Sequence, residues 1–211
     1  MTRHARSERL LLCDELDRLG PDRPTLCDGW QTRDLAAHLV VRERRPDAAA
    51  GVLVRALSGY TDKVQNGIAA GPWNALVERV RRGPPMWSPT RLDPVERAVN
   101  TVEFFVHHED VRRAVDGWTA RELDPELTRD LRGALRRMAR VLTRRSPVGV
   151  VFEPTDGGAS ITGHRGDPTV TVRGPVGELV LFAYGRGDHA VVELDGSTDA
   201  VHALRGARLG L

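Results

Sequence analysis

The sequence contains almost no lysine and carries almost no net charge. Of its 31 basic residues only Lys63 is a lysine, and the formal net charge is +2. The arginines alternate with acids, as in the segment Arg42-Glu43-Arg44-Arg45. A surface that binds nucleic acid would be more one-sided in charge. We therefore expect no nucleic-acid partner.

The sequence is also poor in cysteine and lacks a long apolar run. Cys13 and Cys27 are its only cysteines, in 211 residues of which 40% are hydrophobic. A chain of this length and composition needs no disulfide bonds to fold, so free buried thiols are expected. No segment approaches the roughly 20 apolar residues of a membrane-spanning helix. The first residues lead into an amphipathic pattern with Asp14 and Glu15, unlike a signal peptide. These features predict a cytoplasmic protein without a membrane partner.

Helical periodicity dominates the sequence up to about residue 146. Breaks such as Gly20-Pro21 and Gly71-Pro72 separate the apolar repeats. Thr32 is expected to cap a helix that has Asp34 in its first turn. The segment Asp93-Pro94-Val95-Glu96 has the residues of a helix start. The expected helices cover residues 8–19, 32–45, 47–57, 60–70, 73–82, 93–115 and 125–144.

After Pro147 the pattern changes to short β-branched runs separated by glycine-rich turns. These runs predict strands at 148–152, 169–173 and 190–194, with helices at 178–184 and 198–204. We therefore expect an α+β protein with a helical domain at 1–146 and a small α/β domain at 147–211.

Glu103 and His107 are four residues apart in the expected helix 93–115. At this spacing the two side chains lie one turn apart on the same face and can bind one ion together. On a helical projection both fall between two apolar patches, whereas His108 falls on another side and is the poorer ligand.

His38 lies in the expected helix 32–45, three residues after Leu35 and three before Val41, so it should point inward. A single inward histidine is more often a hydrogen-bonded core residue than a ligand. Burying two imidazoles and a carboxylate without a partner is costly, however, and a cation would remove that cost. The sequence therefore predicts a divalent metal site formed by His38, Glu103 and His107.

Two segments resemble a known family. The segment DGWQTRDLAAHL, from Asp28 to Leu39, resembles the signature of the mycothiol-dependent maleylpyruvate isomerase N-terminal family, a branch of the DinB-like superfamily. The segment EFFVHHEDVRRA, from Glu103 to Ala114, is similar to the second metal motif of that family, in an actinobacterial subgroup. The resemblance spans nearly the whole chain.

The resemblance implies a DinB-like four-helix bundle in which His38, Glu103 and His107 hold a divalent metal, with zinc as the expected ion and solvent in the open positions. It also implies a small C-terminal α/β domain, because the segment VRGPVGELVLFAYGR, from Val172 to Arg186, looks like the strand, helix and Gly-Arg ending of the family. In the isomerase-like members an arginine of this domain faces the metal. Arg186 is therefore the expected catalytic residue, as a clamp for an anionic substrate.

The function implied by the resemblance is a mycothiol-dependent transferase or isomerase. A site with two histidines, one carboxylate and an open position is of the catalytic type. In the resembled enzymes the open position receives the sulfur of mycothiol, and a metal lowers the pKa of a thiol. The partners would be a small-molecule thiol and a small electrophilic substrate. A metal-dependent hydrolase, in which the metal activates water, and a non-catalytic metal-binding module remain alternatives.

Asp110 and Cys27 have two interpretations each. Asp110 can accept a ring proton from His107 or His38, or it can pair with a neighbouring arginine at the surface. Cys27 is a reactive thiol if exposed, and we favour a buried structural thiol. Trp30 and Trp118 are expected to pack the ends of the helical domain.

Overall fold

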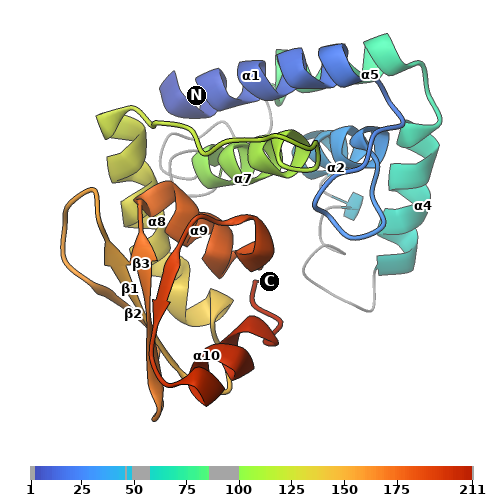
Figure 1. The fold of residues 1–211 in the computed structure, drawn as a ribbon. Helices are drawn as coiled ribbons and strands as arrows, with labels where there is room; N and C mark the ends of the chain where they lie inside the picture. The colour runs from blue at the N-terminus through green and yellow to red at the C-terminus, as the bar shows by residue number, and fades with distance from the viewer. Residues whose placement is uncertain (1–2, 46, 49–57, 86–99, 211) are drawn as a thin grey trace. The chain divides into compact units, whose positions relative to one another are not determined.

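The computed structural model describes residues 3–45, 47–48, 58–85 and 100–210. The chain divides into two compact units, Met1–Trp118 and Thr119–Leu211. The first unit is helical over its described residues, and the second combines helices with a four-stranded sheet (Figure 1). The predicted α+β class is therefore confirmed. The expected helix 47–57, except for its first two residues, and the start of the expected helix 93–115 lie outside the described residues.

The first unit is built from helices that share one apolar core. Helix α1 packs against α7 and α5, and helix α2 packs against α4 and α5. No helix in the described ranges is long and apolar enough to cross a membrane. The helices of this unit are α1 (Arg3–Leu19), α2 (Thr32–Arg44), α4 (Ser58–Ala69), α5 (Trp73–Arg82) and α7 (Thr101–Arg112).

The core of the first unit follows from the spacing of its apolar residues. Leu12 and Leu16 in α1, and Leu35 and Leu39 in α2, recur every four residues and are fully buried. Phe104 of α7 lies in the same cluster. Burial of each large apolar side chain stabilises the fold by about 1.5–3 kcal/mol. This core fixes the faces of α2 and α7 that carry the predicted ligands.

Helix α2 begins differently from the prediction. Gln31 is the residue before the helix, and its backbone N–H donates to Oδ2 of Asp34 over 2.9 Å. Thr32 is already helical, and its hydroxyl donates to the carbonyl of Gly20 over 2.6 Å. The prediction that Thr32 caps α2 was wrong, because a tertiary hydrogen bond to the chain after α1 takes its side chain. That bond fixes the start of α2 relative to α1.

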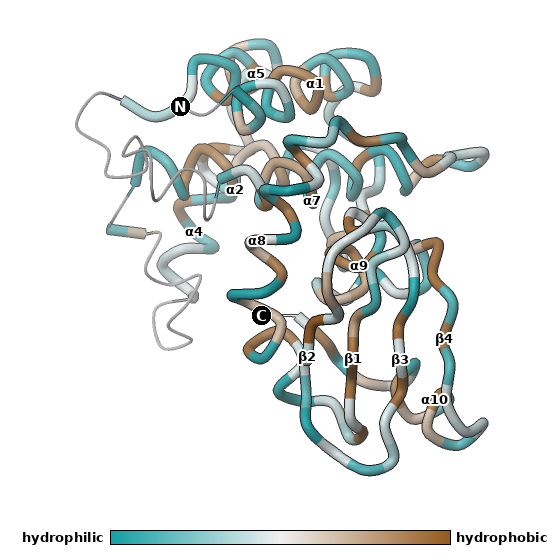
Figure 2. Tube along the Cα trace, turned by 90° about the vertical axis from the view of Figure 1, so that its left-hand side faces the viewer, coloured by the Kyte–Doolittle hydropathy of each residue, from teal (hydrophilic) through white to brown (hydrophobic). Residues whose placement is uncertain are grey.

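The second unit contains a sheet with strand order β2-β1-β3-β4, which Figure 2 shows side by side. Strand β1 pairs antiparallel with β2 and parallel with β3, and β3 pairs antiparallel with β4. Helix α9 is buried along its whole length, as expected for a segment that is apolar on all sides. The elements are α8 (Pro125–Leu142), β1 (Gly149–Pro154), β2 (Ile161–His164), β3 (Thr169–Gly174), α9 (Val176–Ala183), the 3-10 helix η4 (Gly187–His189), β4 (Glu193–Asp195) and α10 (Thr198–Arg205).

Helix α8 belongs to the second unit, whereas the sequence pattern predicts a boundary near Ser146. The helix begins at an Asp124 cap, whose carboxylate accepts from the backbone of Glu126 over 2.8 Å. It packs against β2 and α9. The change in sequence pattern at Pro147 therefore marks a change of secondary structure, whereas the division between the compact units lies between Trp118 and Thr119.

Strand β2 was missed by the sequence analysis, and β4 is shorter than the expected strand 190–194. In β2, Ile161 and Gly163 face inward. A side chain at Gly163 would come within 2.9 Å of Thr143 Oγ1 and 3.0 Å of the Phe152 ring. The close approach requires glycine, so the strand lacks the β-branched residues that identify strands in a sequence.

A buried ion pair joins α1 to α2. The side chains of Arg9 and Glu43 are 0% and 1% exposed. Nη1 of Arg9 donates to Oε2 of Glu43 over 2.8 Å and to the carbonyl of Val80 over 2.9 Å. The guanidinium also lies over the Phe104 ring, 4.1 Å from its centroid. Removing either partner would leave an uncompensated charge in the core.

We predict that Glu43→Ala lowers the free energy of unfolding by about 3–5 kcal/mol, because the Arg9 charge stays buried without its carboxylate. The control is Glu78→Ala, which removes an acid from exposed pairs with Arg81 and Arg82. Exposed pairs contribute about 0–1 kcal/mol. Urea denaturation of both variants measures the difference, and equal effects would contradict the prediction.

Candidate metal centre

The structure brings together the three predicted metal ligands. Helix α2 supplies His38, and α7 supplies Glu103 and His107 from successive turns. Oε1 of Glu103 lies 3.3 Å from Nε2 of His38 and 3.3 Å from Nε2 of His107. One potential ligand atom from each of the three residues lies within 4.8 Å of the other two. Two helices thus direct two imidazole nitrogens at one carboxylate.

The donor set suits zinc. Zinc in proteins lies about 2.0–2.2 Å from nitrogen and oxygen ligands, so neighbouring ligands of a tetrahedral ion are about 3.3–3.6 Å apart. The two carboxylate–imidazole separations agree with that spacing. Hydrogen bonds have similar lengths, so the identity of the donors and the orientation of the rings must support the assignment as well.

Asp110 fixes the orientation of the His107 ring. Its carboxylate is fully buried, and Oδ2 lies 3.0 Å from Nδ1 of His107. With Asp110 as acceptor, Nδ1 carries the proton and Nε2 is left to face Glu103. Carboxylates play this role beside many zinc-binding histidines. Of the two interpretations of Asp110, the structure supports the bond to His107, whereas Arg112 and Arg113 pair with Glu109.

Arg42 lies at the same site and was not found from the sequence. It follows His38 by one helical turn, and its Nε lies 3.4 Å from Oε1 of Glu103. Its Nη2 donates to Oδ1 of the buried Asn100 over 2.8 Å. Its Nη1 is buried and has no hydrogen-bond partner in the part of the chain that the structure describes. The spacing of four residues from His38 was the one signal in the sequence.

Burial and pairing shift the pKa values of the three residues. Burial lowers the pKa of His38 and outweighs its bond to Glu103. Burial also opposes protonation of His107, but hydrogen bonds with Asp110, Cys27 and Glu103 together raise its pKa well above the usual range. Burial opposes ionisation of Glu103. The positive charge of Arg42 and the hydrogen bonds with His107 and His38 outweigh this effect, so the pKa of Glu103 is well below the usual range.

The two cysteines differ in their surroundings. Burial raises the pKa of the Cys13 thiol to about 12, as expected for a core cysteine. Cys27 is only partly buried, so the expectation of a buried structural thiol was wrong for this residue. Its Sγ lies 3.2 Å from Oδ2 of Asp110 and 3.9 Å from Nδ1 of His107. Cys27, His107 and Asp110 thus form a second group of potential ligands.

His108, Trp30 and Trp118 differ in whether they contact the three predicted ligands. His108 is turned away from Glu103, and its Nδ1 lies 3.1 Å from Oε2 of Glu8 on α1, so it is not part of the ligand group. The ring centroids of Trp30 and His38 are 5.2 Å apart, so Trp30 packs directly on a predicted ligand. Trp118 stacks with Arg113, whose Cζ lies 4.5 Å from the ring centroid.

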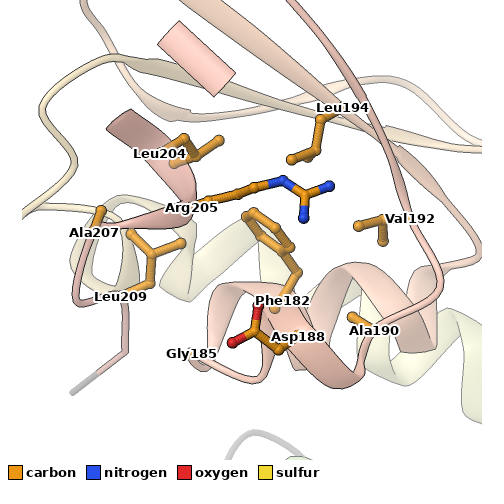
Figure 3. Close-up of a pocket in the computed structure, with 11 residues that line it drawn as sticks. Phe182, Gly185, Asp188, Ala190, Val192, Leu194, Leu204, Arg205, Ala207 and Leu209 are labelled. Carbon is orange, nitrogen blue, oxygen red and sulfur yellow. The ribbon is translucent and has the colours of Figure 1, made fainter. Parts of the chain in front are cut away.

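Arg186 lies in the second compact unit, on the segment after α9. Its Nη1 donates to the backbone carbonyl of Tyr184 over 2.6 Å. The same unit contains a cavity of about 240 Å³. Figure 3 shows Arg205 reaching across this cavity and Asp188 at its edge. Arg186 is not among the residues that line the cavity, and its predicted role as an anion clamp stays a prediction.

The fold and the site define an α+β protein with two histidines and a glutamate gathered between two helices. No family model matches the sequence, and none of the curated proteins matches it. A histidine-to-alanine variant of mycothiol-dependent maleylpyruvate isomerase matches with a TM-score of 0.62 and 16% identity, over 91% of this chain and 90% of that chain. The crystal structure of the isomerase itself matches with a TM-score of 0.57 and 18% identity over the same shares of the two chains. The chain therefore has the fold of this isomerase, and the predicted relationship is confirmed at the level of the fold.

We predict that, in metal-free protein, His107 titrates well above the usual histidine range and His38 below it. Replacing Asp110 with asparagine should lower the pKa of His107, because the hydrogen bond to a negative charge is lost. Titration of the histidine ring signals by NMR measures both values. A His107 ring whose pKa lies at or below that of His38 would contradict the prediction.

Proposed function

We propose that the protein binds a divalent metal ion, with zinc as the proposed ion, through His38, Glu103 and His107, and that it uses the ion in a thiol-dependent transferase or isomerase reaction. The observation that carries the proposal is the convergence of two Nε2 atoms from separate helices on one carboxylate oxygen. The helical unit would correspond to a DinB-like four-helix bundle. The thiol would be mycothiol, and the second substrate a small electrophile.

The chemistry of the donor set supports a catalytic site. Three protein ligands leave a position open on a four-coordinate ion, as in catalytic zinc sites. When bound, such an ion lowers the pKa of a coordinated thiol, so that the nucleophilic thiolate predominates. His107 is held in the tautomer that presents Nε2 to the site by its bond to Asp110. Trp30 covers His38 and limits the access of water to that ring.

Charge at the site favours an anionic ligand. A divalent ion, the carboxylates of Glu103 and Asp110 and the Arg42 guanidinium together still leave an excess of positive charge beside two neutral imidazoles. An incoming thiolate or carboxylate would reduce that excess. The buried Nη1 of Arg42 is a hydrogen-bond donor available for such a ligand. We therefore propose Arg42 as an anion-binding residue, together with the clamp proposed for Arg186.

The similarity to solved structures supports the choice of thiol. Both matching structures are of a mycothiol-dependent maleylpyruvate isomerase, and each match covers 91% of this chain. The shared fold raises the expectation of a related reaction, but the ligand geometry must support it independently. If the site instead activates water, the protein is a metal-dependent hydrolase. If no substrate is turned over, it is a metal-binding module.

We predict that Cys27→Ser protein, purified without added metal, contains nearly one zinc ion per chain. The Cys27→Ser background removes the one thiol close to the site. In this background His38→Ala and His107→Ala should each remove most of the zinc, because two remaining ligands bind weakly. His108→Ala is the control, since it removes a buried histidine that contacts Glu8 instead. Elemental analysis measures zinc, and circular dichroism confirms folding. Unchanged zinc in the two ligand variants would refute the site.

A titration with mycothiol tests the thiol mechanism. In cobalt-loaded Cys27→Ser protein, mycothiol should produce a sulfur-to-cobalt charge-transfer band, because its sulfur binds the metal. Since Cys27 is absent, the band can be assigned to mycothiol. Arg42→Gln should weaken this binding about tenfold, the effect of losing one hydrogen bond to a charged group. Arg33→Gln is the control, because Arg33 is on the same helix but pairs with Asp22. A spectrum that mycothiol leaves unchanged would exclude coordination of the thiol.

A further inference from the structure

The second group of potential ligands lies on the other nitrogen of the His107 ring. Sγ of Cys27, Nδ1 of His107 and Oδ2 of Asp110 form a triangle. The Asp110 oxygen lies 3.2 Å from the Cys27 sulfur and 3.0 Å from the His107 nitrogen, and the sulfur and the nitrogen are 3.9 Å apart. Cys27 comes from the loop before α2, and the other two residues come from α7. Neither Cys27 nor Asp110 belongs to the group formed by His38, Glu103 and His107.

The size of this triangle agrees with a tetrahedral ion. Zinc–sulfur bonds are about 2.3 Å and zinc–nitrogen or zinc–oxygen bonds about 2.0–2.2 Å, so ligand pairs would be about 3.3–3.6 Å apart. The observed sides lie within a few tenths of an ångström of these values. Thiolate, imidazole and carboxylate are all ligands of zinc and its soft relatives.

The loop that carries Cys27 is tied to α7 and to itself. The backbone N–H of Leu26 donates to the carbonyl of Asp110 over 3.0 Å. The N–H of Cys27 donates to Oγ1 of Thr25 over 3.2 Å, and the N–H of Trp30 donates to the carbonyl of Cys27 over 2.9 Å. These bonds hold the thiol beside the carboxylate before any ion binds, which lowers the cost of ordering the site.

We propose that Cys27, His107 and Asp110 form a second cation site that takes a thiophilic divalent ion such as zinc or cadmium. Binding would release the thiol proton of Cys27 and the Nδ1 proton of His107 to solvent. The ion would then be held by the thiolate, Nδ1 and the Asp110 carboxylate, which is already negative. Because Cys27 is partly exposed, a solvent molecule can reach the fourth position. The site goes beyond the proposed thiol reaction and does not depend on it.

The two sites share one imidazole ring. An ion beside His38 and Glu103 would bind Nε2 of His107, and an ion beside Cys27 would bind Nδ1 of the same ring. Simultaneous occupation therefore makes the ring of His107 a bridge between two ions. This arrangement couples the thiol of Cys27 to the ligands on the other side of the ring.

The test uses a variant that lacks the first site. The double variant His38→Ala/Glu103→Gln removes two of the three ligands of that site and keeps all three of the second. Titration with cobalt should give a sulfur-to-cobalt charge-transfer band in the absence of any added thiol. Adding Cys27→Ser should abolish the band and weaken cobalt binding at least tenfold, whereas Cys13→Ser should change neither. Cobalt binding without the band, or no binding by a folded double variant, overturns the proposal.

A second measurement uses the protein with all of its proposed ligands, so it does not depend on correct folding of the double variant. In the otherwise unchanged protein, cadmium NMR should show a resonance shifted by a sulfur ligand, and Cys27→Ser should remove it. Resonances from nitrogen and oxygen ligands alone would overturn the second site. The zinc content of the Cys27→Ser series tests the first site separately, so failure of one site is distinguishable from failure of the other.

Discussion

The pairing of buried polar side chains along α7 is the constraint on which the helical unit depends. Five consecutive residues, Val106 to Asp110, are buried, and four of them are polar or charged. A buried charge is tolerated only when it is paired and hydrogen-bonded. His108 therefore contacts Glu8, Glu109 binds Arg113, and Asp110 contacts His107. The His108–Glu8 pair joins α7 to α1 and so constrains how α7 is rotated, whereas the other two pairs satisfy polar groups within α7 and its C-terminal end.

The candidate centre is a consequence of that rotation. With His108 in contact with Glu8 of α1, Glu103 and His107 of α7 face His38 of α2. The carboxylate of Glu103 then lies among three nitrogen groups, two imidazoles and the guanidinium of Arg42. In the metal-free protein hydrogen bonds join these groups, and the same convergence is what a divalent ion requires. Protons and metal ions would therefore compete for one set of atoms.

His107 connects the two parts of this network. One ring nitrogen faces Glu103, and the other faces Asp110 and Cys27. A change at the thiol therefore acts on the ring through Asp110, and a change at Glu103 acts on it directly. Residues that share a ring in this way are not energetically independent, so their substitutions should be combined in double-mutant cycles.

The sequence by itself determined the α+β class, most helix positions and the pairing of Glu103 with His107. These features follow from periods of two and 3.6 residues, which neighbouring residues specify locally. It also identified a resemblance whose expected fold is the fold observed. Helix α9 and the strand at β3 were predicted within three residues, because continuous apolar and β-branched runs are distinctive.

Only the tertiary structure decided which side chains meet across helices. The positions of Arg42 and Cys27 at the site, and the use of Thr32 at Gly20, depend on the packing of segments that are distant in the sequence. Strand β2 was hidden for a similar reason, because close packing against Phe152 requires a glycine where a β-branched residue would have marked the strand. Local periodicity specifies the face of a helix, but the partner of each polar group on that face is set by the rotation and approach of the neighbouring helix.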